Sequence, residues 1–270
     1  MTDGSARSYL SARGLDQLRD RLNERDLEIV RRVVEWRLLS ARQIQALYFP
    51  GKEHANELVA IRARQRVLAR LCRERLLVAL DRRVGGVRAG SAGLVLAPGP
   101  IAHRVIGDSS RRRAYEPSVR FFAHTLAISQ LVVDVTLAAR AGALELLEAQ
   151  AEPTCWRVVA DLHGRRWLKP DAFLSLAVQS YEVRWWIEVD QATESLATVL
   201  DKCRLYAAYR QTGREQASSG GVFPRVCWVV PDEVRAARLR QAIGGDRRLP
   251  AGLFVVTTSD QAMGVLGSHK

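Results

Sequence analysis

Three carboxylates in the second half of the 270-residue sequence stand where strands of a sheet are predicted to converge. Asp171 follows a proline within one predicted strand (167–178), and Glu188 and Asp190 end the next (181–190). Residues two apart on a strand point to the same face, so Glu188 and Asp190 are expected on one side of the sheet. With Asp171 beside them, the three carboxylates would bind Mg²⁺ or Mn²⁺, hard cations that prefer carboxylate oxygens. Such a metal activates water and stabilises charge on a phosphoryl group, which is the chemistry of DNA cleavage.

The same carboxylates also have a simpler interpretation. A Pro-Asp pair and a Glu-x-Asp triplet are both short motifs, and carboxylates near strand ends are often solvated. A nuclease-like fold that binds DNA without cleaving it is a third interpretation, and the sequence leaves the three open.

A second set of residues suits contact with phosphate. Residues 54–88 contain nine arginines against three carboxylates, whereas a solvated surface usually mixes both signs. We predict that the DNA-contacting arginines lie on a helix over about 54–75 and on the basic tip of a following hairpin: Arg62, Arg64, Arg66, Arg70, Arg73, Arg82, Arg83 and Arg88. The alternative is an ordinary solvated helix face.

The overall charge agrees with a nucleic-acid partner. The chain has a net charge of +12 and a pI near 10.3. Residues 1–117 hold 23 basic and 13 acidic side chains, whereas residues 118–270 hold 18 and 16. A basic half joined to a nearly neutral half is expected when one domain binds a polyanion. General basicity that only aids solubility is the alternative.

The first half has the element order of a winged helix-turn-helix domain, predicted over 23–98. Asn23 and Ser40 are typical N-caps of two helices, and the third helix follows over about 54–75. On this third helix Leu58, Ile61, Val67, Leu68 and Leu71 are expected to form the apolar face. Two apolar runs separated by a Gly/Arg turn then predict the hairpin. In such domains the third helix enters the major groove of double-stranded DNA.

The second half alternates helices and strands. Its order predicts an α/β domain over 119–260 with an αβββαβ core resembling restriction endonucleases, so the fold class is α+β with two domains. The three consecutive core strands are expected over 154–160, 167–178 and 181–190. We assign residues 1–22 to an N-terminal extension, 99–118 to a linker and 261–270 to a C-terminal tail.

Several classes of protein are disfavoured. The four cysteines form no C-x-x-C pair, which indicates reduced buried thiols rather than a zinc site or a disulfide framework. The five histidines form neither H-E-x-x-H nor a His-apolar-His triplet, which argues against zincins and paired-histidine relaxases. The apolar runs are expected to fall short of the ~20 residues of a membrane span, so we expect a cytoplasmic, nucleoid-associated protein.

The acidic motif and the topology resemble the PD-(D/E)xK nuclease superfamily. This resemblance implies that Asp171 and Glu188 are metal-binding acids. The position of the superfamily lysine is Asp190 here, and Lys202 on the next helix would take its place near the scissile phosphate.

A narrower resemblance is to the replication-relaxation family of actinobacterial plasmids and mobile elements. It covers roughly residues 22–232 and rests on segments 24–30, 39–44, 62–71, 124–128, 169–171 and 187–194, with Lys202 and Tyr206 downstream. It implies a winged-helix DNA-binding protein acting in replication or conjugative DNA processing.

Three hypotheses about function follow. The first is a DNA-binding protein of a plasmid or mobile element with a nuclease-like second domain, whose catalytic activity this hypothesis does not require. The second is an active metal-dependent DNA endonuclease that uses Asp171, Glu188, Asp190 and Lys202. The third is a winged-helix transcriptional regulator whose second domain forms a homodimer or binds a partner. The expected partners are double-stranded DNA and other replication or transfer proteins of the element, with no membrane.

Overall fold

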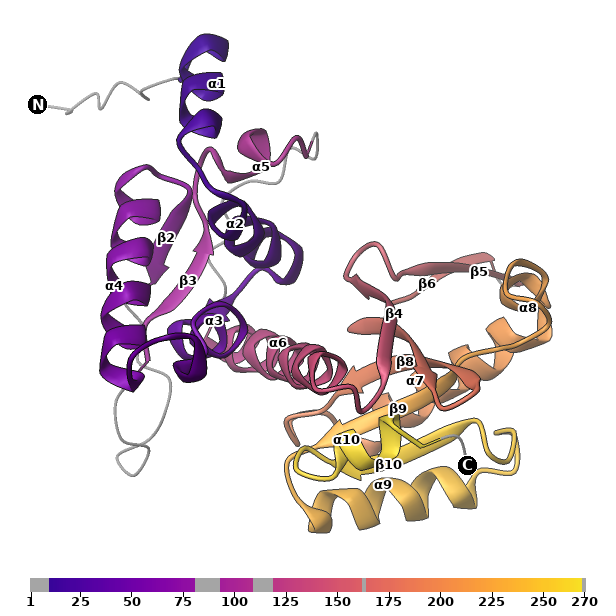
Figure 1. Ribbon diagram of the computed structural model, residues 1–270. Coiled ribbons are helices and arrows are strands. Elements are labelled where there is room, and N and C mark those ends of the chain that lie inside the picture. Colours follow the sequence, from indigo (N-terminus) through magenta and orange to yellow (C-terminus); the bar gives the residue numbers. More distant parts are fainter. Residues whose placement is uncertain (1–9, 81–92, 109–118, 162–163, 269–270) are drawn as a thin grey trace, which may run out of the picture. The chain divides into compact units, whose positions relative to one another are not determined.

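The computed structural model describes residues 10–80, 93–108, 119–161 and 164–268. Over these ranges the chain is a mixed α+β protein with ten α-helices and three sheets (Figure 1). It divides into two compact units, residues 1–126 and 127–270, and each is described separately below.

Unit 1 consists of helices around a three-stranded sheet. The sheet has the order β1-β3-β2 and all its neighbours are antiparallel. Its elements are α1 (Ala12–Asp20), α2 (Glu24–Trp36), β1 (Leu39–Ser40), α3 (Ala41–Tyr48), a short 3-10 helix η1 (Gly51–Glu53), α4 (Glu57–Arg73), β2 (Leu77–Leu80), β3 (Val95–Pro98) and α5 (Ala102–Val105).

The predicted caps of α2 and α3 are confirmed. Asn23 accepts a hydrogen bond from the amide of Asp26, and Asp26 accepts one from the amide of Asn23. Ser40 and Gln43 form the same reciprocal pair at α3. Such capping boxes satisfy backbone donors that a helix start leaves free, and they explain why both helices begin where the sequence predicts.

The end of β3 requires a glycine. Gly99 donates its amide to Leu76 O, and a Cβ at Gly99 would lie 2.1 Å from Arg75 O. The next residues, including buried Ala102 and Val105 of α5, pack on unit 1, where Arg19 donates to Val105 O at 2.6 Å. The first part of the predicted linker is therefore folded structure, while residues 109–118 lie outside the described ranges.

Unit 2 is built on a five-stranded mixed sheet with the order β10-β9-β8-β7-β4. Strands β8, β9 and β10 are parallel, whereas β7 pairs antiparallel with both β8 and β4. Its elements are β4 (Glu145–Ala151), β5 (Arg157–Asp161), β6 (Gly164–Leu168), β7 (Ala172–Val178), β8 (Tyr181–Val189), α7 (Leu196–Gln211), α8 (Arg214–Ser218), β9 (Arg225–Val230), α9 (Glu233–Gly245), β10 (Phe254–Thr258) and α10 (Ala262–Leu266).

The core of unit 2 lies between this sheet and the helices α7 and α9. Trp186, Trp228 and Val256 from three strands pack with Tyr206 of α7 and Leu239 of α9 in one buried cluster. Side chains two apart on a strand share a face, so Glu188 lies on the same face of β8 as Trp186.

Two strand predictions for this unit are wrong. The run 154–160 corresponds to β5, which pairs only with β6 and lies outside the main sheet among the described residues. The first strand of the sheet is β4, whose half-exposed sequence is rich in Glu and Ala and has weak strand propensity. The run 167–178 is two strands, because Pro170 cannot donate to a ladder and separates β6 from β7.

Helix α6 (Val119–Arg140) crosses the boundary between the units in sequence. Contrary to the expectation from sequence, residues 121–140 are long and apolar enough to span a membrane, by length and composition alone. In the protein, 44% of the most apolar window is buried, and core helices of soluble proteins can meet the same criteria of length and composition.

Candidate functional site

The three predicted carboxylates come from adjacent strands at one end of the main sheet. Because β7 runs antiparallel to β8, the start of β7 lies beside the end of β8. Asp171, just before β7, donates its amide to Ile187 O at 3.0 Å, and its Oδ2 accepts from the amide of Val189 at 2.7 Å. Asp171 is thus attached to β8 on either side of Glu188, although it precedes the strand rather than lying within it.

Glu188 is buried and bound through both of its oxygens. Its side chain is 1% exposed; Oε2 accepts from Nζ of Lys202, and Oε1 accepts from the hydroxyl of Tyr206 at 2.5 Å. Lys202 and Tyr206 are four residues apart on α7 and therefore lie on the same face of that helix. Glu188 and Lys202, two of the predicted catalytic residues, are therefore in direct contact.

Burial and the neighbouring charges have opposing effects on the pKa values of Glu188 and Lys202. Burial raises the pKa of the Glu188 carboxyl to about 8, against the opposing effect of the Lys202 ammonium, and nearby Asp171 raises it further. Burial alone would lower the pKa of Lys202, but the charges of Glu188 and Asp171 raise it above its ordinary value. Asp171, Glu188 and Lys202 therefore form one electrostatic cluster, which we call the acid–lysine cluster.

Asp190 has a different partner. It follows β8 and is 2% exposed, and its Oδ2 accepts from Nε of Arg235 of α9 at 2.6 Å. Arg235 also donates to Glu194 O at 2.7 Å. Oδ1 of Asp190 is buried and has no hydrogen-bond partner among the described residues. The arginine explains how an aspartate is tolerated at a buried strand end.

The structure does not gather the three carboxylates around one metal position. Carboxylate oxygens suit Mg²⁺ or Mn²⁺ in type. However, the described part of the chain brings no three His, Cys, Asp or Glu side chains together in a group able to hold a metal. Lys202 and Tyr206 also occupy both oxygens of Glu188. A metal bound by Asp171, Glu188 and Asp190 stays a prediction.

The cysteines are free thiols, as the sequence predicts. Cys155, Cys203 and Cys227 are buried and Cys72 is partly so. Cys155 lies at the edge of the acid–lysine cluster, where its Sγ donates to Pro170 O at 3.2 Å. Burial and the charge of Asp171 raise its pKa to about 12, so it is a neutral thiol rather than a nucleophile.

The predicted arginines of α4 are divided between two faces. Arg62, Arg66 and Arg73 are exposed. Arg70 instead pairs with buried Asp26 of α2 at 2.7 Å, and half-buried Arg64 donates to Ala41 O of α3.

Two of these arginines thus join α4 to its neighbouring helices. Arg82, Arg83 and Arg88 lie outside the described residues.

The exposed side of α4 also contains Leu58, which the sequence pattern wrongly assigned to the apolar face. Leu58 was expected in the apolar face, but it is 65% exposed, and Ala60 occupies the buried position. One side of the helix therefore presents a set of exposed residues, here called the α4 face: Leu58, Arg62, Gln65, Arg66, Ala69 and Arg73. The α4 face contains no carboxylate.

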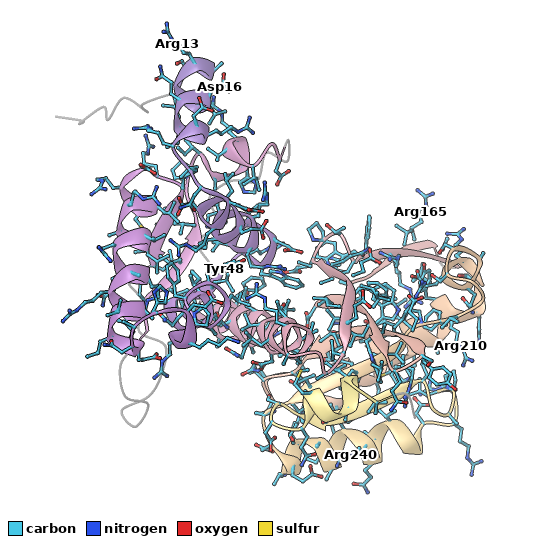
Figure 2. The ribbon with its side chains drawn as sticks, viewed as in Figure 1. Arg13, Asp16, Tyr48, Arg165, Arg210 and Arg240 are labelled. Carbon is cyan, nitrogen blue, oxygen red and sulfur yellow. The ribbon has the colours of Figure 1, made fainter. Side chains whose placement is uncertain are left out.

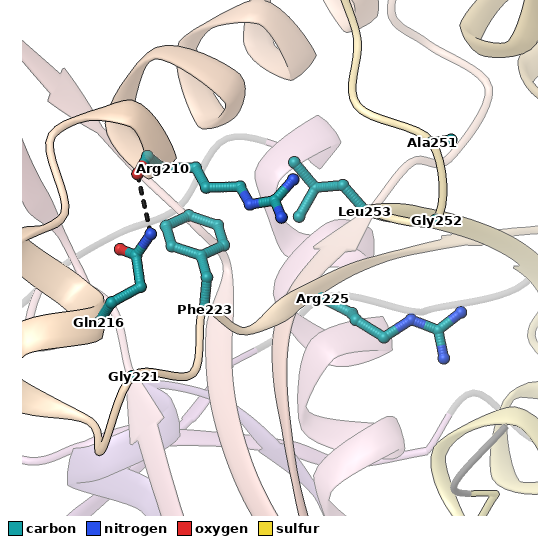
Figure 3. A pocket seen from close by; sticks show the side chains of 8 residues that line it. All are labelled: Arg210, Gln216, Gly221, Phe223, Arg225, Ala251, Gly252 and Leu253. Atoms are coloured by element: carbon teal, nitrogen blue, oxygen red, sulfur yellow. Dashed lines mark hydrogen bonds between the residues drawn. The ribbon is translucent and has the colours of Figure 1, made fainter.

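A cavity of about 240 Å³ lies away from all these residues, at the opposite end of β9 from the carboxylates. Figure 3 shows Arg210 and Phe223 on one side and Leu253 on the other, with Gln216 donating to Arg210 O at 2.9 Å. It contains no predicted site residue.

Sequence reasoning missed three buried pairs, namely Glu188–Tyr206, Asp190–Arg235 and Asp26–Arg70. The spacing of Lys202 and Tyr206 on one helix face is a signal that points to the first. The other two join residues 45 and 44 positions apart, and no local pattern reveals them.

The raised pKa of Glu188 leads to a test of the acid–lysine cluster. Between pH 4.5 and about 8 the folded protein keeps a proton that the unfolded chain has lost, so this group makes the fold less stable as pH rises. Glu188→Gln removes the titration. We expect wild type to lose stability relative to this variant, by at most about 1.4 kcal/mol per pH unit, in urea denaturation at pH 5 and pH 7.5. A wild type that gains stability relative to the variant would contradict the shift.

Comparison with known protein families gives a match over much of the chain. The sequence model of a family described as Replication-relaxation matches residues 30–226, which is more than half of the chain. No curated protein and no solved structure matches.

Proposed function

Because the chain belongs to the replication-relaxation family, whose name indicates a role in replication, we propose that it binds double-stranded DNA of a mobile element through the α4 face. Unit 1 would be a winged helix-turn-helix domain. Helices α2, α3 and α4 followed by the β2–β3 pair have that element order.

The observation that carries the proposal is the composition of the α4 face. Three exposed arginines on a 17-residue helix, with no carboxylate among them, attract a polyanion. Arg62 and Arg66 can each contact phosphates or the O6 and N7 atoms of guanine, and Gln65 between them can pair with adenine. Exposed Leu58 suits the methyl group of thymine.

The interior contacts support the same proposal. Arg70 and Arg64 hold α4 against α2 and α3, so the α4 face is presented on a helix whose position is fixed. A rigid element of this kind reads base edges more selectively than a loop does.

Salt dependence tests the proposal. Binding to a duplex should weaken steeply as salt rises, because each phosphate contact releases counterions. With three phosphate contacts, the plot of log affinity against log salt should fall with a slope of about −2.7. Phosphate contacts weaken in roughly the range from 50 to 200 mM salt. An affinity that stays unchanged over this range would contradict DNA binding through the α4 face.

A metal-dependent DNA endonuclease is the second candidate. Taken without β5, β6 and the short helix α8, the order α6-β4-β7-β8-α7-β9 is αβββαβ, which supports a nuclease-like core for unit 2. The acid–lysine cluster lies where the PD-(D/E)xK resemblance implies catalytic residues. A metal there would activate water for attack on phosphate.

A supercoiled-plasmid assay with Mg²⁺, Mn²⁺ or EDTA tests this second candidate. An endonuclease predicts metal-dependent nicking that is lost in Asp171→Asn and Glu188→Gln. Nicking by both variants at the wild-type rate would show that Asp171 and Glu188 do not catalyse the cleavage. Salt-sensitive binding without cleavage under either metal would leave the cluster as a structural feature.

A further inference from the structure

The β5–β6 pair extends from unit 2 as a two-faced hairpin. Its register places Val158 opposite Trp167 and Ala160 opposite Arg165, so these four side chains share one face. Val159 and Leu168 lie on the other face, are almost fully buried, and belong to the core beneath α7. One face therefore anchors the hairpin and the other faces outward.

The outward face combines a tryptophan with cations. Trp167 is 56% exposed, whereas the other five tryptophans of the sequence, all within the described ranges, are buried or partly buried. Arg165 and Lys169, two residues to either side of it, are exposed as well. Figure 2 shows Arg165 directed away from the ribbon.

The tryptophan is held in a defined position. Trp156 packs edge-on against Trp167 with ring centroids 6.3 Å apart, and Lys169 Nζ lies 4.6 Å from the centroid of Trp156. Arg157, on the anchored face, pairs with Glu215 at 3.0 Å and lies over Trp186. The exposed ring is thus supported from one side while its remaining surface stays in solvent.

We propose that this outward face binds single-stranded DNA, with the ring of Trp167 stacking on an unpaired base and Arg165 and Lys169 contacting the flanking phosphates. An aromatic ring flanked by cations is the recurring arrangement for single strands. Duplex DNA keeps its base faces stacked, so an exposed ring has nothing to stack on there. The inference extends the proposed DNA-binding function to a second surface.

The position of the hairpin agrees with a role in DNA processing. Lys169 is two residues from Asp171, a span of at most about 7 Å. Cys155, at the other base of the hairpin, donates to Pro170 O. A strand bound along the outward face would therefore end beside the acid–lysine cluster.

Fluorescence anisotropy with a labelled 20-nucleotide oligo(dT) and a labelled 20-base-pair duplex tests the inference. Trp167→Ala should weaken oligo(dT) binding by about 10-fold, and Trp167→Phe should retain most of it, because phenylalanine keeps a ring on which a base can stack. Arg165→Ala/Lys169→Ala should also weaken it. The matched controls Tyr181→Ala and Arg238→Ala/Arg247→Ala replace exposed residues elsewhere in unit 2 and should change it less than twofold.

The outcomes separate this inference from the proposed function. Loss of oligo(dT) binding in Trp167→Ala, with duplex binding unchanged, supports single-strand binding by the outward face of the hairpin. Absence of oligo(dT) binding by wild type, or an effect of Trp167→Ala no larger than that of Tyr181→Ala, overturns it. Wild type that binds oligo(dT) but not duplex would contradict the α4 proposal alone.

Discussion

Replacing Arg62 and Arg66 together with alanine is expected to weaken binding to duplex DNA by roughly 100-fold at moderate salt. Each arginine that contacts a phosphate or a guanine contributes about 1–3 kcal/mol, and both lie on the carboxylate-free α4 face. The slope of log affinity against log salt should also become shallower by about 2, because two phosphate contacts are lost. Fluorescence anisotropy at several salt concentrations measures both quantities.

The matched control is Arg13→Ala/Arg31→Ala, which removes the same charge from exposed positions on α1 and α2. Figure 2 labels Arg13 on its helix. This control should lower affinity only slightly, through the change in net charge. Equal losses in the two double variants would mean that general basicity, and not the α4 face, binds DNA.

Replacing Asp26 with alanine is expected to lower the free energy of unfolding by about 3 kcal/mol. Its carboxylate is fully buried, accepts from the amide of Asn23 at the start of α2, and pairs with Arg70 of α4. The substitution removes one part of the capping box and leaves a partly buried guanidinium without its partner. Urea denaturation measures the loss.

Glu28→Ala is the control for this prediction, because it removes an exposed pair with Arg31 and should cost less than about 1 kcal/mol. Arg70→Ala should destabilise the protein like Asp26→Ala while leaving the salt slope of DNA binding unchanged. A shallower salt slope with normal stability in Arg70→Ala would instead mean that Arg70 contacts DNA.

The sequence predicts local structure in unit 1 because its signals are local. Asn23 and Ser40 cap their helices through residues three positions away, and β2 and β3 each come from a short apolar run. The faces of α4 are less predictable, since Leu58 continues the helical apolar spacing yet is exposed near the start of the helix.

In unit 2 the strand prediction fails at the edge of the sheet. Among the described residues the edge strand β4 pairs only with β7 and has little apolar periodicity, whereas β5 contains the apolar run Val158–Ala160. Pattern alone does not tell which strands pair, because pairing depends on contacts distant in sequence.

The candidate site is predictable in its members but not in their contacts. The order of elements indicates that Asp171, Glu188 and Lys202 come from neighbouring elements. The hydrogen bonds from Tyr206 to Glu188 and from Arg235 to Asp190 depend on how α7 and α9 pack on the sheet. These contacts decide whether the carboxylates are available to a ligand.

The central claim is that α4 contacts duplex DNA, and photo-cross-linking tests it most directly. A photoreactive amino acid at Gln65, on the α4 face, is compared with the same amino acid at Gln17, an exposed glutamine of α1. We predict a cross-link to labelled duplex from position 65 that unlabelled duplex competes away, and little from position 17. Bound DNA that cross-links equally from both positions, or only from position 17, would contradict the account.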